Sequence, residues 1–167
     1  MSKKVERNYL EISSIDDLND TKNPSEAHSI ELVEPANFQL NRFFYKNVGK
    51  NYHWVDRLVW SENQWIAYTS TKKIKTYILK HKKDLAGYFE LILHHEKNET
   101  EIAYLGLLEE YHNKKLGSYL LSSAIKNSFL NKPKRVWVHT CSLDHKNALN
   151  NYIDRGMKIF KTEIVKV

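Results

Sequence analysis

Residues 101–121 read EIAYLGLLEEYHNKKLGSYLL, and this stretch changes its hydrophobic period halfway along. Its first part is rich in apolar and aromatic side chains, which predicts a strand over 101–108. From Lys115 to Phe129 the apolar residues recur at helical spacing, which predicts a helix. A strand that turns directly into a helix presents free backbone N–H groups, and such groups bind phosphate. The turn contains one glycine, Gly117, and no P-loop pattern, so it fits an ordinary structural turn equally well.

The rest of the chain predicts a mixed order of strands and helices in a single α/β (α+β) domain. Further strands are predicted at residues 28–33, 74–80, 85–94, 135–141 and 157–162. Helices are predicted after Pro35, from Ser61, and from an Asp144 cap to Arg155, with Gly156 at a left-handed position behind the last one. The chain therefore begins with helices, continues with an antiparallel hairpin and ends in a β-α-β-α-β unit.

Composition places the chain among folded proteins of the cytoplasm. It has 167 residues, of which 41% are hydrophobic, enough to build a core. No apolar run approaches the roughly 20 residues of a membrane helix, and we expect neither a membrane partner nor a secretory signal. One cysteine, Cys141, excludes an internal disulfide framework.

Charge is spread unevenly along the chain. Residues 1–36 carry 4 basic and 8 acidic side chains (net −4), and residues 37–167 carry 22 and 12 (net +10). The positive charge of residues 37–167 suits a polyanionic ligand such as a phosphorylated cofactor or a nucleic acid. Lysines that merely solvate the surface explain this charge equally well. The chain has no stacked-aromatic basic motif of the known nucleic-acid binders, so we expect no nucleic-acid partner.

Two motifs resemble those of the GNAT superfamily of acetyl-CoA-dependent N-acyltransferases. HNKKLGSYLL is similar to motif A, Q/R-x-x-G-x-G/A, with His112, Lys115 and Gly117 at its defining positions. HTCSLDHKNALNNYIDRGMKIFKTE is similar to motif B. Its matching residues are Asn147, Ala148, Tyr152 and Gly156, and Met157 stands where Phe is usual. Two linked motifs in this order are much more specific than either alone. The resemblance covers residues 74–162. Within the superfamily, the chain looks like a bacterial subgroup whose acceptor is unassigned.

The resemblance implies a GNAT fold in one domain, residues 1–167. It places acceptor-side strands and helices in residues 1–73 and the acetyl-CoA-binding core in residues 74–162. The implied sheet is mixed and mostly antiparallel, is flanked by about four helices, and splays between its fourth and fifth expected strands, 101–108 and 135–141.

Coenzyme A lies in this splay in the family that the chain resembles. Pantetheine is expected to pair with the backbone near Leu107 and Leu108, and Asn147 to bond the pantetheine arm. The pyrophosphate is expected at the amides of His112, Asn113, Lys114, Lys115, Leu116, Gly117 and Ser118. Lys115 replaces a glycine of the motif, which adds a Cβ where space is tight and an ammonium that can pair with phosphate.

The resemblance also implies catalytic roles in a direct attack of an amine on the acetyl thioester. An alkylammonium with a pKa near ~10.4 must first lose a proton, and Glu101 stands where several members carry the base. Tyr152 stands where the family's general acid protonates the departing thiolate. The alternatives are an ion-paired glutamate at a strand edge and a tyrosine packed by its ring. Glu90 is the second candidate, as base or as a clamp on a cationic acceptor, unless it lies on a solvated face.

The acceptor is expected to meet the first half of the chain. His53, Trp54 and Arg57 are the candidate substrate-binding residues, in a cluster that also contains Tyr45, Trp60 and Trp65. Aromatic rings with an arginine can hold a planar or carboxylate-bearing acceptor, although each tryptophan taken alone fits a core anchor better.

Other functions remain as alternatives. The chain can be a non-catalytic coenzyme A-binding sensor or interaction module, and a homodimer is compatible with the resemblance. His139, Cys141 and His145 have a superficial metal-ligand spacing, but they lack a fourth ligand, so we expect no metal. The leading hypothesis is an N-acetyltransferase for a primary amine of a small molecule, amino acid or peptide.

Overall fold

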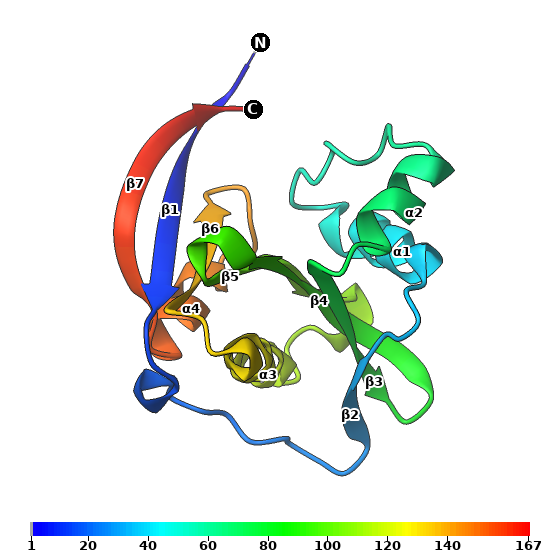
Figure 1. The fold of residues 1–167 in the computed structure, drawn as a ribbon, viewed down its shortest axis with the longest axis horizontal. Helices are drawn as coiled ribbons and strands as arrows, with labels where there is room; N and C mark the ends of the chain where they lie inside the picture. Colours follow the sequence, from blue (N-terminus) through cyan, green and yellow to red (C-terminus); the bar gives the residue numbers. More distant parts are fainter. Residues whose placement is uncertain (1) are drawn as a thin grey trace.

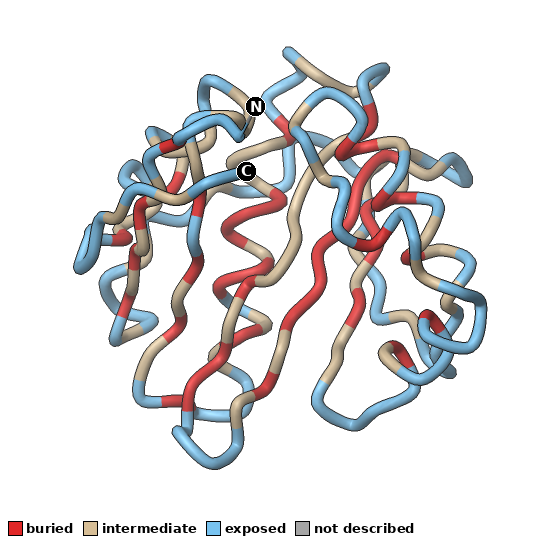
Figure 2. Tube along the Cα trace, turned by 90° about the horizontal axis from the view of Figure 1, so that it is seen from above, coloured by how far each residue is buried: buried red, intermediate tan, exposed pale blue. Residues whose placement is uncertain are grey.

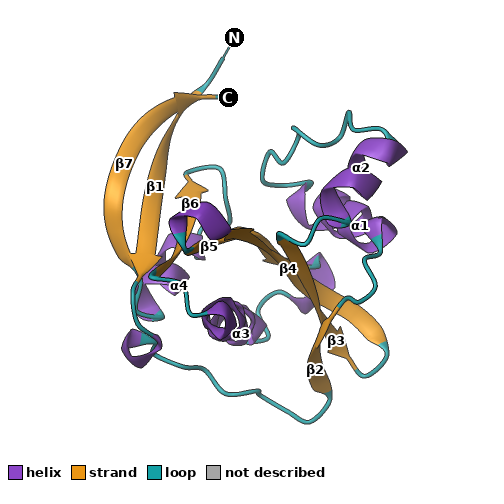
Figure 3. Cartoon of the chain, in the orientation of Figure 1, coloured by secondary structure: helices purple, strands orange, loops and turns teal. Residues whose placement is uncertain are grey.

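One sheet and four α-helices make up the computed structural model, which describes residues 2–167 (Figures 1 and 3). The elements are β1 (Lys4–Ile12), β2 (His28–Leu32), α1 (Phe38–Gly49), α2 (Glu62–Thr69), β3 (Ile74–His81), β4 (Asp84–His94), β5 (Glu99–Leu107), α3 (Leu116–Ser128), β6 (Arg135–Cys141), α4 (Ala148–Asp154) and β7 (Lys158–Lys166). Within these residues, no helix is both long and apolar enough to cross a membrane.

The seven strands follow the order β2-β3-β4-β5-β6-β1-β7. All neighbours are antiparallel except β5 and β6, which run parallel. That pair has only three rungs, from Glu99 opposite Arg135 to Glu101 opposite Trp137, and beyond them the two strands diverge. The expected fold class, a mostly antiparallel sheet splayed between strands 101–108 and 135–141, is therefore confirmed.

The first strand, β1, is missing from the sequence prediction, which places helices first. β1 lies between β6 and β7 and pairs antiparallel with both. Its residues alternate between buried and more exposed sides, but Lys4, Glu6, Arg7 and Glu11 break up the apolar pattern. The strand is stabilised by neighbours distant in sequence, which no local pattern reveals.

Helices cover both faces of the sheet. On one face α3 packs against β4 and β5 around a core that includes Leu91, Ile102 and Leu120, and Figure 2 shows this buried centre in red. On the other face Phe44 of α1 stacks on Tyr88 of β4, with ring centroids 4.8 Å apart. The diverging ends of β5 and β6 therefore lie between the layer that contains α3 and the layer that contains α1.

A β-bulge in β5 decides which side chains face which layer. Glu90 of β4 pairs with Tyr104, and the next residue, Leu91, pairs with Ile102, so Ala103 has no partner. Ile102 therefore packs toward α3, whereas Tyr104 packs toward α1. Glu101, on the opposite side of the strand from Ile102, faces the same layer as Tyr104.

The last helix differs from the prediction at its start and agrees at its end. It begins at Ala148, and Asp144 does not cap it. The Asp144 carboxylate instead accepts hydrogen bonds from Thr140 Oγ1 at 2.5 Å and from the Cys141 N–H at 3.0 Å. Gly156 has a φ of +107°, as predicted, and a Cβ there would collide with the Asp17 carbonyl oxygen.

Candidate active site

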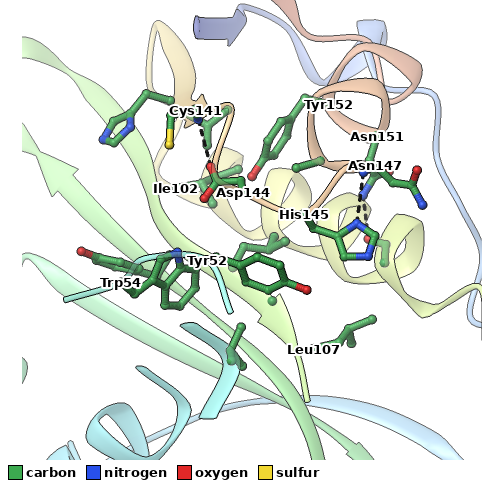
Figure 4. Close-up of a pocket in the computed structure, with 18 of the residues that line it drawn as sticks. Tyr52, Trp54, Ile102, Leu107, Cys141, Asp144, His145, Asn147, Asn151 and Tyr152 are labelled. Atoms are coloured by element: carbon green, nitrogen blue, oxygen red, sulfur yellow. Dashed lines mark hydrogen bonds between the residues drawn. The ribbon is translucent and has the colours of Figure 1, made fainter. Parts of the chain in front are cut away.

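A cavity of about 1070 Å³ passes through the splay between β5 and β6. Its walls come from both strands, the loop after α1, the turn between β5 and α3, and α4 (Figure 4). One end lies at the N-terminus of α3, and the other lies beside β1 and the α1–α2 loop. The cavity thus reaches both of the regions to which the sequence assigns binding.

The α3 end of the cavity is built from an unusual turn. Asn113 and Lys115 both adopt left-handed backbone conformations, with φ of 60° and 61°. Lys115 is the N-cap residue of α3 and caps no helical N–H with its side chain. Within the part of the chain described, no carbonyl outside α3 accepts a bond from the N–H groups of residues 113–118. Such a turn at a helix N-terminus forms an anion-binding concavity.

Most of the predicted coenzyme-binding residues line this cavity, namely Leu107, His112, Asn113, Lys115, Leu116, Gly117, Ser118 and Asn147. Leu108 and Lys114 do not. The Leu108 N–H donates to the Ala86 carbonyl at 2.8 Å, so it is already used within the sheet. The Lys114 ammonium lies 5.8 Å from the centre of the Tyr111 ring. The Leu107 carbonyl oxygen lies 3.2 Å from His112 Nε2, which donates to it when that nitrogen carries the proton.

Three of the lining residues that were not predicted make contacts that shape the cavity. Asn151 donates to the Gly117 carbonyl at 3.1 Å and ties α4 to the start of α3. Arg155 bonds Thr21 through one nitrogen, while its buried Nε has no partner among residues 2–167. Tyr52 lies across the cavity with its ring edge-on to His145, 5.9 Å between centroids (Figure 4). Asn151 and Arg155 stand one and two helical turns after Asn147, a spacing that could have indicated them.

Tyr152 lies in the middle of the cavity on α4. The residue is 8% exposed, and its hydroxyl points toward the Asp144 carboxylate (Figure 4). Burial raises the pKa of Tyr152 well above its usual range, and the negative charge of Asp144 raises it further. The hydroxyl is therefore protonated at neutral pH and can donate a proton.

Glu101 lies at the closed end of the splay and lines the same cavity. Its side chain is 14% exposed, and its Oε1 lies 2.9 Å from His94 Nε2. The His94 ring stacks on Trp137, with centroids 6.0 Å apart. One oxygen of Glu101 is thus held by a neighbour, as the ion-pair alternative expects, and Oε2 has no hydrogen bond among residues 2–167.

Of the two charged residues expected on the acceptor side, Arg57 lines the cavity and Glu90 does not. Glu90 is completely buried and does not line the cavity. It accepts from Arg57 Nη1 at 2.9 and 3.3 Å and from Asn41 Nδ2 at 2.7 Å. A carboxylate satisfied in this way reaches no substrate, so its placement does not support a role as base or clamp.

Arg57 mainly holds the loop that follows α1. It is 7% exposed and is among the residues that line the cavity. Its guanidinium lies 4.2–5.7 Å from the centres of five rings, those of Tyr45, Trp60, Trp65, Tyr68 and Tyr104. Burial raises the pKa of Tyr104 to about 12. The loop fixed in this way brings His53 and Trp54 to the cavity wall, as predicted.

A metal centre finds no support in the described residues, because no group of three His, Cys, Asp or Glu side chains there is placed to hold an ion. Cys141 is a free thiol at the cavity wall. The cavity wall thus carries a carboxylate, a protonated tyrosine and, at its α3 end, a turn with free backbone amides.

The chain belongs to the acetyltransferase (GNAT) family, whose model matches residues 35–157. The resemblance stated from the two sequence motifs is therefore confirmed.

Solved structures share this fold at low sequence identity. A GCN5-related N-acetyltransferase from Kribbella flavida superposes with a TM-score of 0.68 at 15% identity, over 96% of this chain and 56% of its own. A second, from Sphaerobacter thermophilus, has a TM-score of 0.69 at 12% identity, over 99% and 52%. The ribosomal-protein-S18-alanine N-acetyltransferase from Escherichia coli has a TM-score of 0.60 at 15% identity, over 77% and 76%.

The chain spans 52–61% of the length of the first three structures that it matches. None of the curated proteins compared with the chain matches it. The fold is therefore shared with these proteins, and they do not indicate the acceptor.

Proposed function

We propose that this protein transfers an acetyl group from acetyl-CoA to a primary amine of a small molecule, amino acid or peptide. One observation carries the proposal: a single cavity is lined by Glu101, by Tyr152 and by residues 113 and 115–118, whose backbone amides are free. The base, the acid and the anion site of an acetyl transfer thus meet in one space. The transfer is direct, in a ternary complex, since the chemistry requires no acyl-enzyme.

The residues at the α3 end suit coenzyme A. The amides of residues 113–118 and the partnerless Nε of Arg155 can hold the pyrophosphate. The ammonium of Lys115 adds positive charge at the same turn. The pantetheine arm is proposed to run between β5 and β6 past Asn147, with Leu107 beside the thioester.

In the proposed reaction, Glu101 takes a proton from the acceptor ammonium. The neutral nitrogen bonds to the carbonyl carbon, and the C–S bond breaks with its electron pair on sulfur. Tyr152 gives its proton to the thiolate and regains one, through solvent, from the proton released by the acylated nitrogen. A backbone amide near Leu107 is proposed to stabilise the oxyanion.

The proposal also assigns one domain to residues 1–167, with the acceptor side in residues 1–73 and the coenzyme core in residues 74–162. It places the activity in a bacterial cytoplasm, where the free thiol of Cys141 is stable. It includes no metal, nucleic acid or membrane, and it allows a homodimer.

The test is calorimetric binding of acetyl-CoA, followed by release of free thiol with a panel of amines. We expect binding, and thiol release that depends on the acceptor. Binding without release on any acceptor would support the coenzyme A sensor instead, and absence of binding would overturn the proposal.

Variants test the two roles. Glu101→Gln and Tyr152→Phe should each lower turnover by about 10²- to 10⁴-fold while coenzyme A affinity changes little. Glu62→Gln, on exposed α2, and Tyr77→Phe, stacked on Phe89 away from the cavity, are matched controls that should keep the full rate. Full turnover in both site variants would show that the role assignments are wrong.

A further inference from the structure

The end of the cavity beside β1 and the α1–α2 loop, where His53 and Trp54 lie, is the proposed acceptor end. It contains a cation that the proposed chemistry does not use, Arg7 of β1. Arg7 lines the cavity, and its side chain is 30% exposed. Its Nε is buried without a partner among residues 2–167. Its one ion pair there is long, 3.9 Å from Nη1 to Glu163 Oε1. A guanidinium with so few partners has donors available for an anion.

Glu163 is shared in a way that weakens its hold on Arg7. Its Oε1 accepts from the Tyr9 hydroxyl at 2.7 Å, and its Oε2 lies 3.5 Å from Lys161 Nζ. Arg57, the other arginine at this end, is already paired with buried Glu90. Arg7 is therefore the arginine that a substrate carboxylate can engage, with Lys166 also at the cavity wall.

The sheet register places Arg7 on the same face as Glu101. Glu101 pairs with Trp137 of β6, and Arg7 pairs with Cys141, which lies on the same face of β6 as Trp137. His139 stands between them on that strand. Burial lowers the pKa of His139, and the positive charge of Arg7 lowers it further, whereas Glu101 raises it. His139 thus lies in the field of both groups, and its imidazole is neutral at neutral pH.

The same register gives the separation. β5 and β1 are two strand spacings apart, about 10 Å, and Cys141 is four positions after Trp137 along β6, about 13 Å. The amine and carboxylate of an α-amino acid are only about 3 Å apart. Side chains stand roughly perpendicular to a sheet, so those of Glu101 and Arg7 do not approach each other closely enough for so short a molecule to contact both.

We propose that the acceptor is an ω-amino acid, a molecule whose amine is several bonds from its carboxylate, with the amine at Glu101 and the carboxylate on Arg7. This inference rests on the proposed function and names its substrate class. A charge-assisted bond from a guanidinium to a carboxylate is directional, so Arg7 selects acceptors that bear the carboxylate.

The experiment compares matched acceptors that differ only in the carboxylate, δ-aminovalerate and pentylamine, with alanine as the α-amino acid. The wild-type protein should acetylate δ-aminovalerate with a kcat/KM about tenfold or more above those of pentylamine and alanine. Equal rates with the matched pair, or a preference for alanine, would overturn the inference and leave the transferase intact. No thiol release with any amine would overturn the proposed function and the inference together.

Arg7→Gln should raise KM for δ-aminovalerate by about 10- to 100-fold, with kcat and the KM for pentylamine within about twofold of wild type. Arg7→Lys keeps the charge and should recover part of the loss. Arg42 lies over the Phe38 ring on α1, and Arg42→Gln is the matched control, which should change neither KM. Coenzyme A binding checks that each variant is folded. An equal rise in KM for both acceptors in Arg7→Gln would contradict a carboxylate-binding role.

Discussion

Lys115 holds a left-handed conformation, with φ of 61° and ψ of 23°, at the motif position where the family has glycine. A side chain in this conformation costs roughly 1 kcal/mol that glycine avoids. Lys115→Gly should therefore stabilise the fold by up to about 1 kcal/mol, as measured by urea unfolding. Lys114→Gly is the matched control, because Lys114 has no positive φ, and it should destabilise the protein. A loss of stability in Lys115→Gly would show that the lysine side chain contributes more than the backbone strain removes.

At the same scale, position in a motif was enough to select residues that lie on the cavity wall, whereas their roles stay predictions. Glu101, Tyr152 and most of the turn at residues 112–118 do line the cavity. The sequence did not reveal that Glu90 is buried away from the cavity, because the partners that bury it come from α1 and the following loop. Arg7 could not be selected either, since its place depends on pairing between strands more than 100 residues apart in sequence.

Among the elements, β5 and β6 meet in only three rungs, and an ion cluster holds that closed end of the splay. Arg135 Nε donates to Glu99 Oε2 at 2.5 Å, and Arg135 Nη1 donates to Glu11 Oε2 at 2.7 Å. The hydrogen bond that Arg135 donates to Glu99 holds the pKa of Glu99 below the usual range. Because the pKa of Glu99 is lower in the folded protein, its ionised carboxylate stabilises the fold above about pH 4.5, the ordinary pKa of glutamate. This stability is lost as the pH falls further.

Glu99→Gln should therefore lower the free energy of unfolding at pH 7 by about 1 to 3 kcal/mol. The difference from wild type should shrink as the pH falls below about 4.5, because the wild-type carboxylate then becomes protonated. Denaturant unfolding at several pH values measures this. Glu96→Gln, at a fully exposed glutamate in the β4–β5 turn, is a control expected to be near neutral at pH 7. A difference in unfolding free energy between wild type and Glu99→Gln that stays constant down to pH 3 would exclude an ionic contribution of Glu99.

The elements that the sequence predicted have strong local patterns. The helices of residues 38–49 and 116–128 and the strands of residues 74–94 show clear periodicity. β1 lacks it because its charged side chains belong to ladders and ion pairs with β6 and β7. Asp144 was assigned to a cap on composition, but its carboxylate closes the turn after β6 instead.

For the whole molecule, the cavity lies between two parts of the sheet, β2 to β5 and β6-β1-β7, that are joined by one short parallel pairing. A ligand that contacts both parts binds only the folded protein, so coenzyme A should stabilise it by mass action. At a concentration about 100 times the dissociation constant, the gain is about 2.7 kcal/mol. Melting temperature measured over a coenzyme A series should rise with the logarithm of concentration. Hydrogen exchange should slow most in β5, β6 and the start of α3, the walls of the splay. A melting temperature independent of coenzyme A, or protection confined to α1 and α2, would contradict binding in the splay.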